Sequence, residues 1–167
     1  SGETADTLAC IREAKSKFCQ IWSFVNSKGS SIDRESDAVI YSHSGQEIGV
    51  ASTKNYVAQL VTLLLFTLKT ATQKGLMNAT KENEFRQALA KLPDQIEMLL
   101  NKNDAIKSIA EKYYKAKNFI YIGRGINFPS ALEGALKLKE ISYIHATGYA
   151  AGELKHGPIA LIDKNMP

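Results

Sequence analysis

Apolar residues recur every three or four positions along much of the chain, which is the spacing of amphipathic helices. The first series of this kind is Leu8, Ile11, Ala14 and Phe18. Thr4, or the turn over residues 1–4, is suited to begin this helix because serine and threonine are common at helix starts. A longer helix is predicted over about 52–74, before a glycine. Residues 81–117 also read as helical, with Pro93 opening or kinking one segment.

Short runs of β-branched and aromatic residues separate these helices and predict strands. The runs cover residues 21–25, 38–41, 119–122 and 159–162. Between the last two, a helix is expected from Pro129 to about 144, and a loop over 149–158. Short strands that alternate with helices indicate a parallel α/β sheet. Ligands of such sheets lie at the carboxyl ends of the strands, beside helix N-termini.

Composition narrows the classes of partner. Hydrophobic residues make up 44% of the 167 residues and charged residues 23%, which suits a globular core. The net charge of +4 is spread along the chain without a basic stripe, so nucleic-acid binding is not expected, whereas a small anionic ligand is. The most apolar stretch, 56–68, contains polar residues and is shorter than the ~20 residues that span a membrane. No membrane association is therefore expected.

The two cysteines, Cys10 and Cys19, lie on opposite faces if both belong to one helix, ~13 Å apart along its axis, and cannot bridge there. A reduced, cytoplasmic protein is the simplest reading, and two buried small side chains are the alternative. No spacing of Cys, His and Asp is typical of a metal site, and no cofactor is expected. The chain lacks a start methionine and both ends look cut, so a piece of a longer protein is expected.

Two segments place hydroxyl groups at predicted helix starts. In the first, Ser1 and Thr4 precede the first helix, where N–H groups and the helix dipole favour an anion and hydroxyls can donate to its oxygens. In the second, Ser52 and Thr53 precede the long helix. Ordinary helix capping is the alternative for both. Two such starts on one sheet favour a shared cleft for a phosphate-bearing ligand.

The helix after Pro129 carries Glu133, Lys137 and Glu140, and steps of four and seven residues place them on one face. They are either an exposed charge ladder or a carboxylate base beside a lysine that tunes it. His156 lies between glycines and a proline, and is either incidental or catalytic. The Gly-Arg-Gly string at 123–125 lacks the third glycine of a dinucleotide loop, so nicotinamide binding is not expected.

Four strings together carry a family resemblance. They are Ser-Gly-Glu-Thr-Ala-Asp-Thr-Leu at 1–8, Glu-Ile-Gly-Val-Ala-Ser-Thr-Lys at 47–54, the segment 131–146, and Ala-Ala-Gly-Glu-Leu-Lys-His-Gly-Pro at 150–158. In order and spacing the chain resembles the isomerase half of the glucosamine-6-phosphate synthase family. The resemblance implies a sugar isomerase (SIS) fold, with three αβα layers and a parallel five-stranded sheet, present twice in tandem. Both copies are expected to be incomplete here.

That resemblance divides the chain. Residues 1–78 would be the remainder of the first SIS domain, 79–104 a helical connection, and 105–167 the beginning of the second domain. It also implies a reaction in which fructose 6-phosphate and ammonia released from glutamine give glucosamine 6-phosphate. The glutaminase domain and a lysine that forms a Schiff base with the sugar lie outside these residues, so the parent is expected to be the enzyme and this piece alone to be inactive.

The resemblance assigns roles residue by residue. Ser1 and Thr4 match hydroxyls that bind the sugar phosphate, and Val50 and Ser52 match a segment that contacts the substrate. The remaining matches lie in the second half. Glu140 matches the base that moves a proton between C1 and C2, Lys137 and Glu133 match its polar companions, and His156 matches the histidine that assists ring opening.

In the family this histidine enters the site of the neighbouring subunit, so a homodimer is implied. Two other classes stay open. One is a non-catalytic SIS module that senses a sugar phosphate, for which the carboxylate base would be unnecessary. The other is a related sugar-phosphate isomerase or deglycase without aminotransfer. An amidotransferase domain upstream in the parent gene would distinguish the synthase from both.

Overall fold

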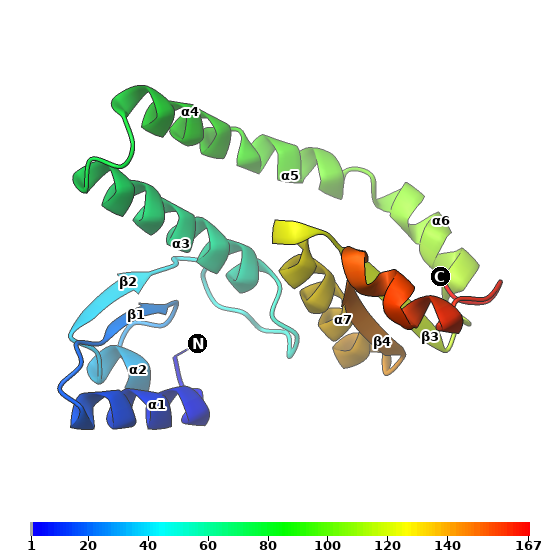
Figure 1. Ribbon diagram of the computed structural model, residues 1–167, viewed down its shortest axis with the longest axis horizontal. Coiled ribbons are helices and arrows are strands. Elements are labelled where there is room, and N and C mark those ends of the chain that lie inside the picture. The colour runs from blue at the N-terminus through cyan, green and yellow to red at the C-terminus, as the bar shows by residue number, and fades with distance from the viewer. Residues whose placement is uncertain (1) are drawn as a thin grey trace. The chain divides into compact units, whose positions relative to one another are not determined.

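Residues 2–167 are described by a computed structural model of the chain, drawn as a ribbon in Figure 1. The chain divides into two compact units, which meet in sequence between Ala90 and Lys91. Each unit combines helices with a pair of parallel strands. The predicted α/β class with parallel sheets is therefore confirmed.

The first unit alternates helices and strands. Its elements are α1 (Ala5–Ser16), β1 (Trp22–Val25), α2 (Ser31–Arg34), β2 (Ala38–Tyr41), α3 (Lys54–Gln73) and α4 (Ala79–Ala90). Strands β1 and β2 are parallel, with registers from Trp22 opposite Ala38 to Val25 opposite Tyr41. Figure 1 shows this pair between α3 on one side and α1 with α2 on the other. Three layers result, with the carboxyl ends of both strands at one edge.

The core of this unit is small and apolar. Ile11, Val25 and Ile32 are buried together, so α1, β1 and α2 share one contact. Burying one such side chain stabilises a fold by about 1.5–3 kcal/mol. On the α3 side, Phe66 meets Trp22 and Phe24 edge to face, with ring centroids 5.9 and 5.4 Å apart. These contacts hold α3 against β1.

In the second unit, one helix packs on a second pair of parallel strands. Its elements are α5 (Leu92–Leu100), α6 (Asn103–Tyr113), β3 (Asn118–Gly123), α7 (Phe128–Ser142), β4 (His145–Ala150) and the 3₁₀ helices η1 (Gly125–Asn127), η2 (Ala151–His156) and η3 (Pro158–Leu161). Strands β3 and β4 are parallel, from Asn118 opposite His145 to Gly123 opposite Ala150. Helix α7 packs on both strands and buries Ala131 and Ala135.

Most predicted elements are confirmed, but the short helix α2 and strand β4 were not expected, and two predicted elements near the end of the chain are wrong. The strand predicted at 159–162 is wrong, because Pro158 begins the 3₁₀ helix η3 there. Proline suits a first helical turn, since its φ is fixed and it has no N–H to leave unpaired. The loop predicted over 149–158 is also wrong. β4 continues to Ala150 and η2 follows directly.

Two smaller expectations at the N-terminal end are corrected. Helix α1 ends at Ser16, and Phe18 beyond it has a φ of 61° and is 98% exposed, so it adds nothing to the apolar face. Cys10 and Cys19 are both exposed and free, so their burial as small hydrophobes is wrong. Pro93 lies in the first turn of α5 and opens that helix. The domain boundaries at 78 and 104 stay predictions.

Over residues 2–167, every helix is too short or too polar to cross a lipid bilayer.

Candidate functional site

Thr4 is the N-cap residue of helix α1, and its carbonyl accepts the N–H of Leu8 at 3.0 Å. Among the described residues, the Thr4 hydroxyl makes no capping hydrogen bond to the helix. This is the position where a phosphate-binding hydroxyl was predicted. Ser1, the other predicted phosphate ligand, lies outside the described residues.

Gly2 ties the loop before α1 to helix α2. It has a φ of 101°, and a Cβ on it would lie 2.2 Å from the Ser30 hydroxyl oxygen, so only glycine fits. The Gly2 carbonyl accepts the N–H of Ile32 at 2.9 Å. Next to it, the Glu3 carboxylate accepts the N–H of Ser31 at 2.9 Å, and hydrogen bonds from Ser31 hold the pKa of Glu3 below its ordinary range. The loop is thus anchored at two consecutive residues.

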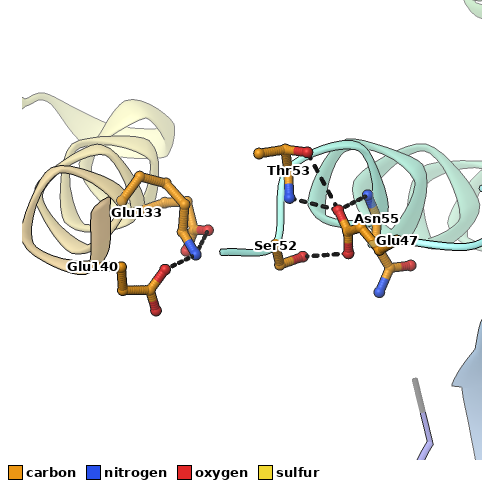
Figure 2. Close-up of polar contacts among 7 residues, drawn as sticks. Glu47, Ser52, Thr53, Asn55, Glu133 and Glu140 are labelled. Carbon is orange, nitrogen blue, oxygen red and sulfur yellow. Dashed lines mark hydrogen bonds and ion pairs between the residues drawn. The ribbon is translucent and has the colours of Figure 1, made fainter. Parts of the chain in front are cut away.

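Helix α3 begins differently, because a carboxylate from the preceding loop caps it (Figure 2). One oxygen of Glu47 accepts the N–H groups of Thr53 at 2.6 Å and Asn55 at 3.3 Å. The other oxygen accepts the hydroxyl of Ser52 at 3.1 Å. The hydrogen bond from the Thr53 N–H is the main cause that lowers the pKa of Glu47. Capping by the Ser52 or Thr53 hydroxyl, the alternative considered from the sequence, is therefore wrong.

The loop between β2 and Glu47 is held by two asparagines. Asn26, just after β1, donates to the Gly45 carbonyl at 2.7 Å and accepts the Ser44 N–H at 2.9 Å. Asn55 is buried in α3 and accepts the hydroxyls of Ser42 and Ser44 at 3.3 and 3.2 Å. These bonds fix the direction in which the chain leaves β2 and approaches α3.

A hollow of about 550 Å³ lies beside this loop, at the carboxyl ends of β1 and β2. It is lined by Asn26, Ser27, His43, Gly45 and Gln46. Ligands of parallel sheets bind at this edge. Val50, further along the same loop, has a fully exposed side chain.

In the second unit, α7 brings the predicted charged stripe together (Figure 2). The ammonium of Lys137 lies 2.5 Å from a carboxylate oxygen of Glu140 and 3.6 Å from one of Glu133. The side chains of Lys137 and Glu133 are half-buried, at 22% and 24% exposure, and that of Glu140 is 35% exposed, so the three are not a fully solvated ladder. The hydrogen bond to Glu140 is the main cause that raises the pKa of Lys137. Lys137 is therefore a cation near neutral pH and cannot serve as a base.

His156 ends the 3₁₀ helix η2 with an exposed side chain. Its Nδ1 lies 2.9 Å from a carboxylate oxygen of Glu153. Among the hydrogen bonds and ion pairs of the described residues, none joins His156 to the stripe on α7. The catalytic role predicted for it stays a prediction.

The first glycine of the Gly-Arg-Gly string at 123–125 has a structural role. A Cβ on Gly123 would lie 2.2 Å from the Asn127 carbonyl oxygen, so this glycine allows the tight turn from β3 into α7.

Within residues 2–167, no group of three or more His, Cys, Asp and Glu side chains is placed to hold a metal ion.

Sequence reasoning missed the roles of Glu47 and Asn26. Both are polar residues in or next to loops, and their partners lie 5–19 positions away. The one signal that pointed to Glu47 is its place ahead of a helix start, where a negative charge is favoured.

Comparison with known proteins identifies the family to which this chain belongs. The family description "SIS domain" matches residues 1–69 and 112–167, so the chain belongs to the SIS domain family. Over its whole length it is 54% identical to a glutamine–fructose-6-phosphate aminotransferase (isomerizing) of Chlorobaculum tepidum. The chain spans 27% of that relative, about a quarter of its length.

Solved structures agree with this assignment. The C-terminal domain of glucosamine-fructose-6-phosphate aminotransferase from Francisella tularensis matches with a TM-score of 0.96 at 45% identity, covering 100% of this chain and 48% of that one. A putative phosphosugar isomerase from Clostridium difficile 630 matches with a TM-score of 0.92 at 30% identity, over 99% of this chain and 47% of that one. The resemblance and the SIS fold predicted from the sequence are confirmed.

Proposed function

We propose that this chain is part of the isomerase half of a glutamine–fructose-6-phosphate aminotransferase. The complete protein would convert fructose 6-phosphate and glutamine-derived ammonia to glucosamine 6-phosphate. The observation that carries the proposal is the 54% identity, over 100% of this chain, to a relative of that name. The similarity to a putative phosphosugar isomerase is weaker, at 30% identity.

In the first unit, Ser1 and Thr4 would bind the phosphate group of the sugar. The Thr4 hydroxyl makes no capping bond among the described residues, which supports its use by a ligand. Val50 and Ser52 would contact the sugar itself. Their loop leaves the carboxyl end of β2, where parallel sheets bind ligands.

In the second unit, Glu140 would move a proton between C1 and C2 of the sugar. A positioned base of this kind typically contributes 10²–10⁴-fold to a rate. Lys137 places a fixed positive charge against the carboxylate that would carry the proton. Glu133 lies 3.6 Å from the same ammonium and would contact the substrate. His156 would assist opening of the sugar ring.

The complete protein would be a cytoplasmic homodimer that needs no metal or other cofactor. Its partners would be sugar phosphates, and neither nucleic acid nor membrane. The residues would divide at 78 and 104 into the end of one SIS copy, a helical connection and the start of the next. These points rest on the family resemblance.

The test uses the full-length protein that contains this chain. It is incubated with fructose 6-phosphate and glutamine labelled with ¹⁵N at the amide, and the sugar phosphates are analysed by mass spectrometry. We expect ¹⁵N-labelled glucosamine 6-phosphate. Isomerised sugar phosphate without nitrogen would instead indicate a phosphosugar isomerase, and binding without any turnover would indicate a sensing module.

A further inference from the structure

We propose that Glu47 is a positioning residue that sets what the loop before α3 can recognise. It turns the Ser52 hydroxyl into a hydrogen-bond acceptor for a sugar hydroxyl and keeps the phosphate group away from this helix start. The inference rests on the proposed function, since it assigns the two ends of the sugar phosphate to different helix starts.

The first step concerns the single hydrogen of the Ser52 hydroxyl. An ionised carboxylate only accepts hydrogen bonds, so the contact of 3.1 Å between Ser52 Oγ and Glu47 Oε2 uses that hydrogen. The Ser52 oxygen then has only its lone pairs available, so towards a ligand it can only accept a hydrogen bond. A sugar hydroxyl can donate to them, whereas an ionised phosphate oxygen is itself an acceptor and cannot. Ser52 therefore selects a hydroxyl.

The second step concerns charge at the helix start. The first N–H groups of a helix attract anions, but at α3 those of Thr53 and Asn55 already bond to Glu47. A phosphate here would have to displace a carboxylate or lie against its negative charge. At α1 the cap residue Thr4 makes no such side-chain bond among the described residues. Asp6 adds charge to the first turn of α1, but it lies within the helix and not ahead of it.

The third step concerns how firmly the carboxylate is held. Glu47 is half-buried. It accepts four hydrogen bonds from three residues at the start of α3, which are Ser52, Thr53 and Asn55. The loop that delivers it is fixed to Asn26 on one side and to Asn55 on the other. The carboxylate is thus preorganised, and Ser52 has one hydroxyl direction before any ligand arrives.

The experiment is a double-mutant cycle in the full-length protein, read by calorimetry with fructose 6-phosphate. In Glu47→Gln the amide NH₂ can donate to Ser52 and reverse its hydroxyl. Loss of one such bond corresponds to about 2- to 13-fold in affinity. We expect Glu47→Gln and Ser52→Ala each to weaken binding by about this factor, and the double variant to be no weaker than the worse single variant. Affinity for inorganic phosphate should change less than about twofold.

Glu82→Gln is the matched control. Glu82 also accepts a hydroxyl, that of Thr72 at 2.8 Å, but it joins α3 to α4 far along the chain from Ser52. Sugar-phosphate affinity should be unchanged in this variant. If Glu47→Gln does not fold, Glu47→Asp replaces it, because the shorter carboxylate cannot reach both Ser52 and the Thr53 N–H. The same non-additive loss is expected.

Two results would overturn the proposal in different ways. Additive losses in the cycle, or a change in phosphate affinity as large as the change in sugar-phosphate affinity, would remove the positioning role of Glu47 alone. Failure of the wild-type protein to bind fructose 6-phosphate would remove the proposed function, and this role with it.

Discussion

The ammonium nitrogen of Lys137 lies 2.5 Å from a carboxylate oxygen of Glu140, three residues further along α7. The same nitrogen lies 3.6 Å from Glu133, four residues earlier. One cation thus contacts two carboxylates on one face of α7. Such contacts are short-range consequences of helix geometry, and they raise the pKa of the lysine.

The first prediction concerns the reactivity of Lys137 as an amine. Its pKa is raised, chiefly by the hydrogen bond to Glu140, so less of it is neutral amine at pH 8 than for an ordinary lysine. Trace acylation with acetic anhydride, read by peptide mass spectrometry, should label Lys137 faster in Glu140→Gln than in the wild type. The exposed Lys139 on the same helix is the internal reference. Equal Lys137 rates in both proteins would contradict the pairing.

The second prediction concerns Glu140 as the base. In the full-length protein, Glu140→Gln should lower turnover by about 10²–10⁴-fold while fructose 6-phosphate affinity changes little. Exchange of the sugar C1 proton with deuterated water, followed by NMR, should slow as well. Lys139→Gln changes a neighbouring charge and should leave both rates near wild type. Wild-type exchange in Glu140→Gln would exclude Glu140 from the proton transfer.

The third prediction concerns Thr4 as a phosphate ligand. Removing its hydroxyl in Thr4→Val should weaken fructose 6-phosphate binding by about 1–3 kcal/mol, the cost of losing a hydrogen bond to a charged group. Glutamine hydrolysis in the absence of sugar should change little. Thr62→Val is the control, because the Thr62 hydroxyl donates to the Ala58 carbonyl within α3. An unchanged Kd for Thr4→Val by calorimetry would refute the assignment.

The fourth prediction concerns His156 and the proposed homodimer. A His156→Ala subunit is mixed with a Glu140→Gln subunit, each inactive as a homodimer. If His156 acts across the subunit interface, one site of the mixed dimer carries both substitutions and the other carries neither. About half of the normal activity per mixed dimer should then return. Mixed dimers confirmed by native mass spectrometry that remain inactive would show that His156 acts within its own chain, or only holds its loop.

The fifth prediction concerns acid stability. The Arg12 hydrogen bond lowers the pKa of Glu35, with nitrogen and oxygen 2.8 Å apart. Because the folded pKa lies below the unfolded one, this stabilisation is present above the unfolded pKa and is lost as the pH falls through the folded pKa. Glu35→Gln should therefore lower the Tm at pH 7 and lower it less as the pH falls from about 5 to 3. A Tm difference that is independent of pH would contradict the linkage.

Local pattern was sufficient for the longer helices and for the stripe on α7, but not for the four-residue helix α2. The spacing of Glu133, Lys137 and Glu140 determines their shared face in any regular helix, so no tertiary information was needed. Strands β1, β2 and β3 were also predicted, because their runs are rich in β-branched and aromatic residues. Strand β4 was missed, since His-Ala-Thr-Gly-Tyr-Ala has neither such a run nor a regular alternation. It is a strand because it pairs with β3, whose first residue lies 27 positions before its own.

The sequence by itself determined the family, the α/β class and the residues that carry the predicted chemistry, because these depend on residue identity and on short-range periodicity. Only the tertiary structure decided how the two helix starts of the first unit differ. Glu47 reaches the α3 N-terminus because Asn26 and Asn55 hold its loop. Gly2 anchors the α1 loop because it lies against Ser30. Hydrogen bonds across a folded loop depend on the backbone path between distant residues, and that path has no local signature in sequence.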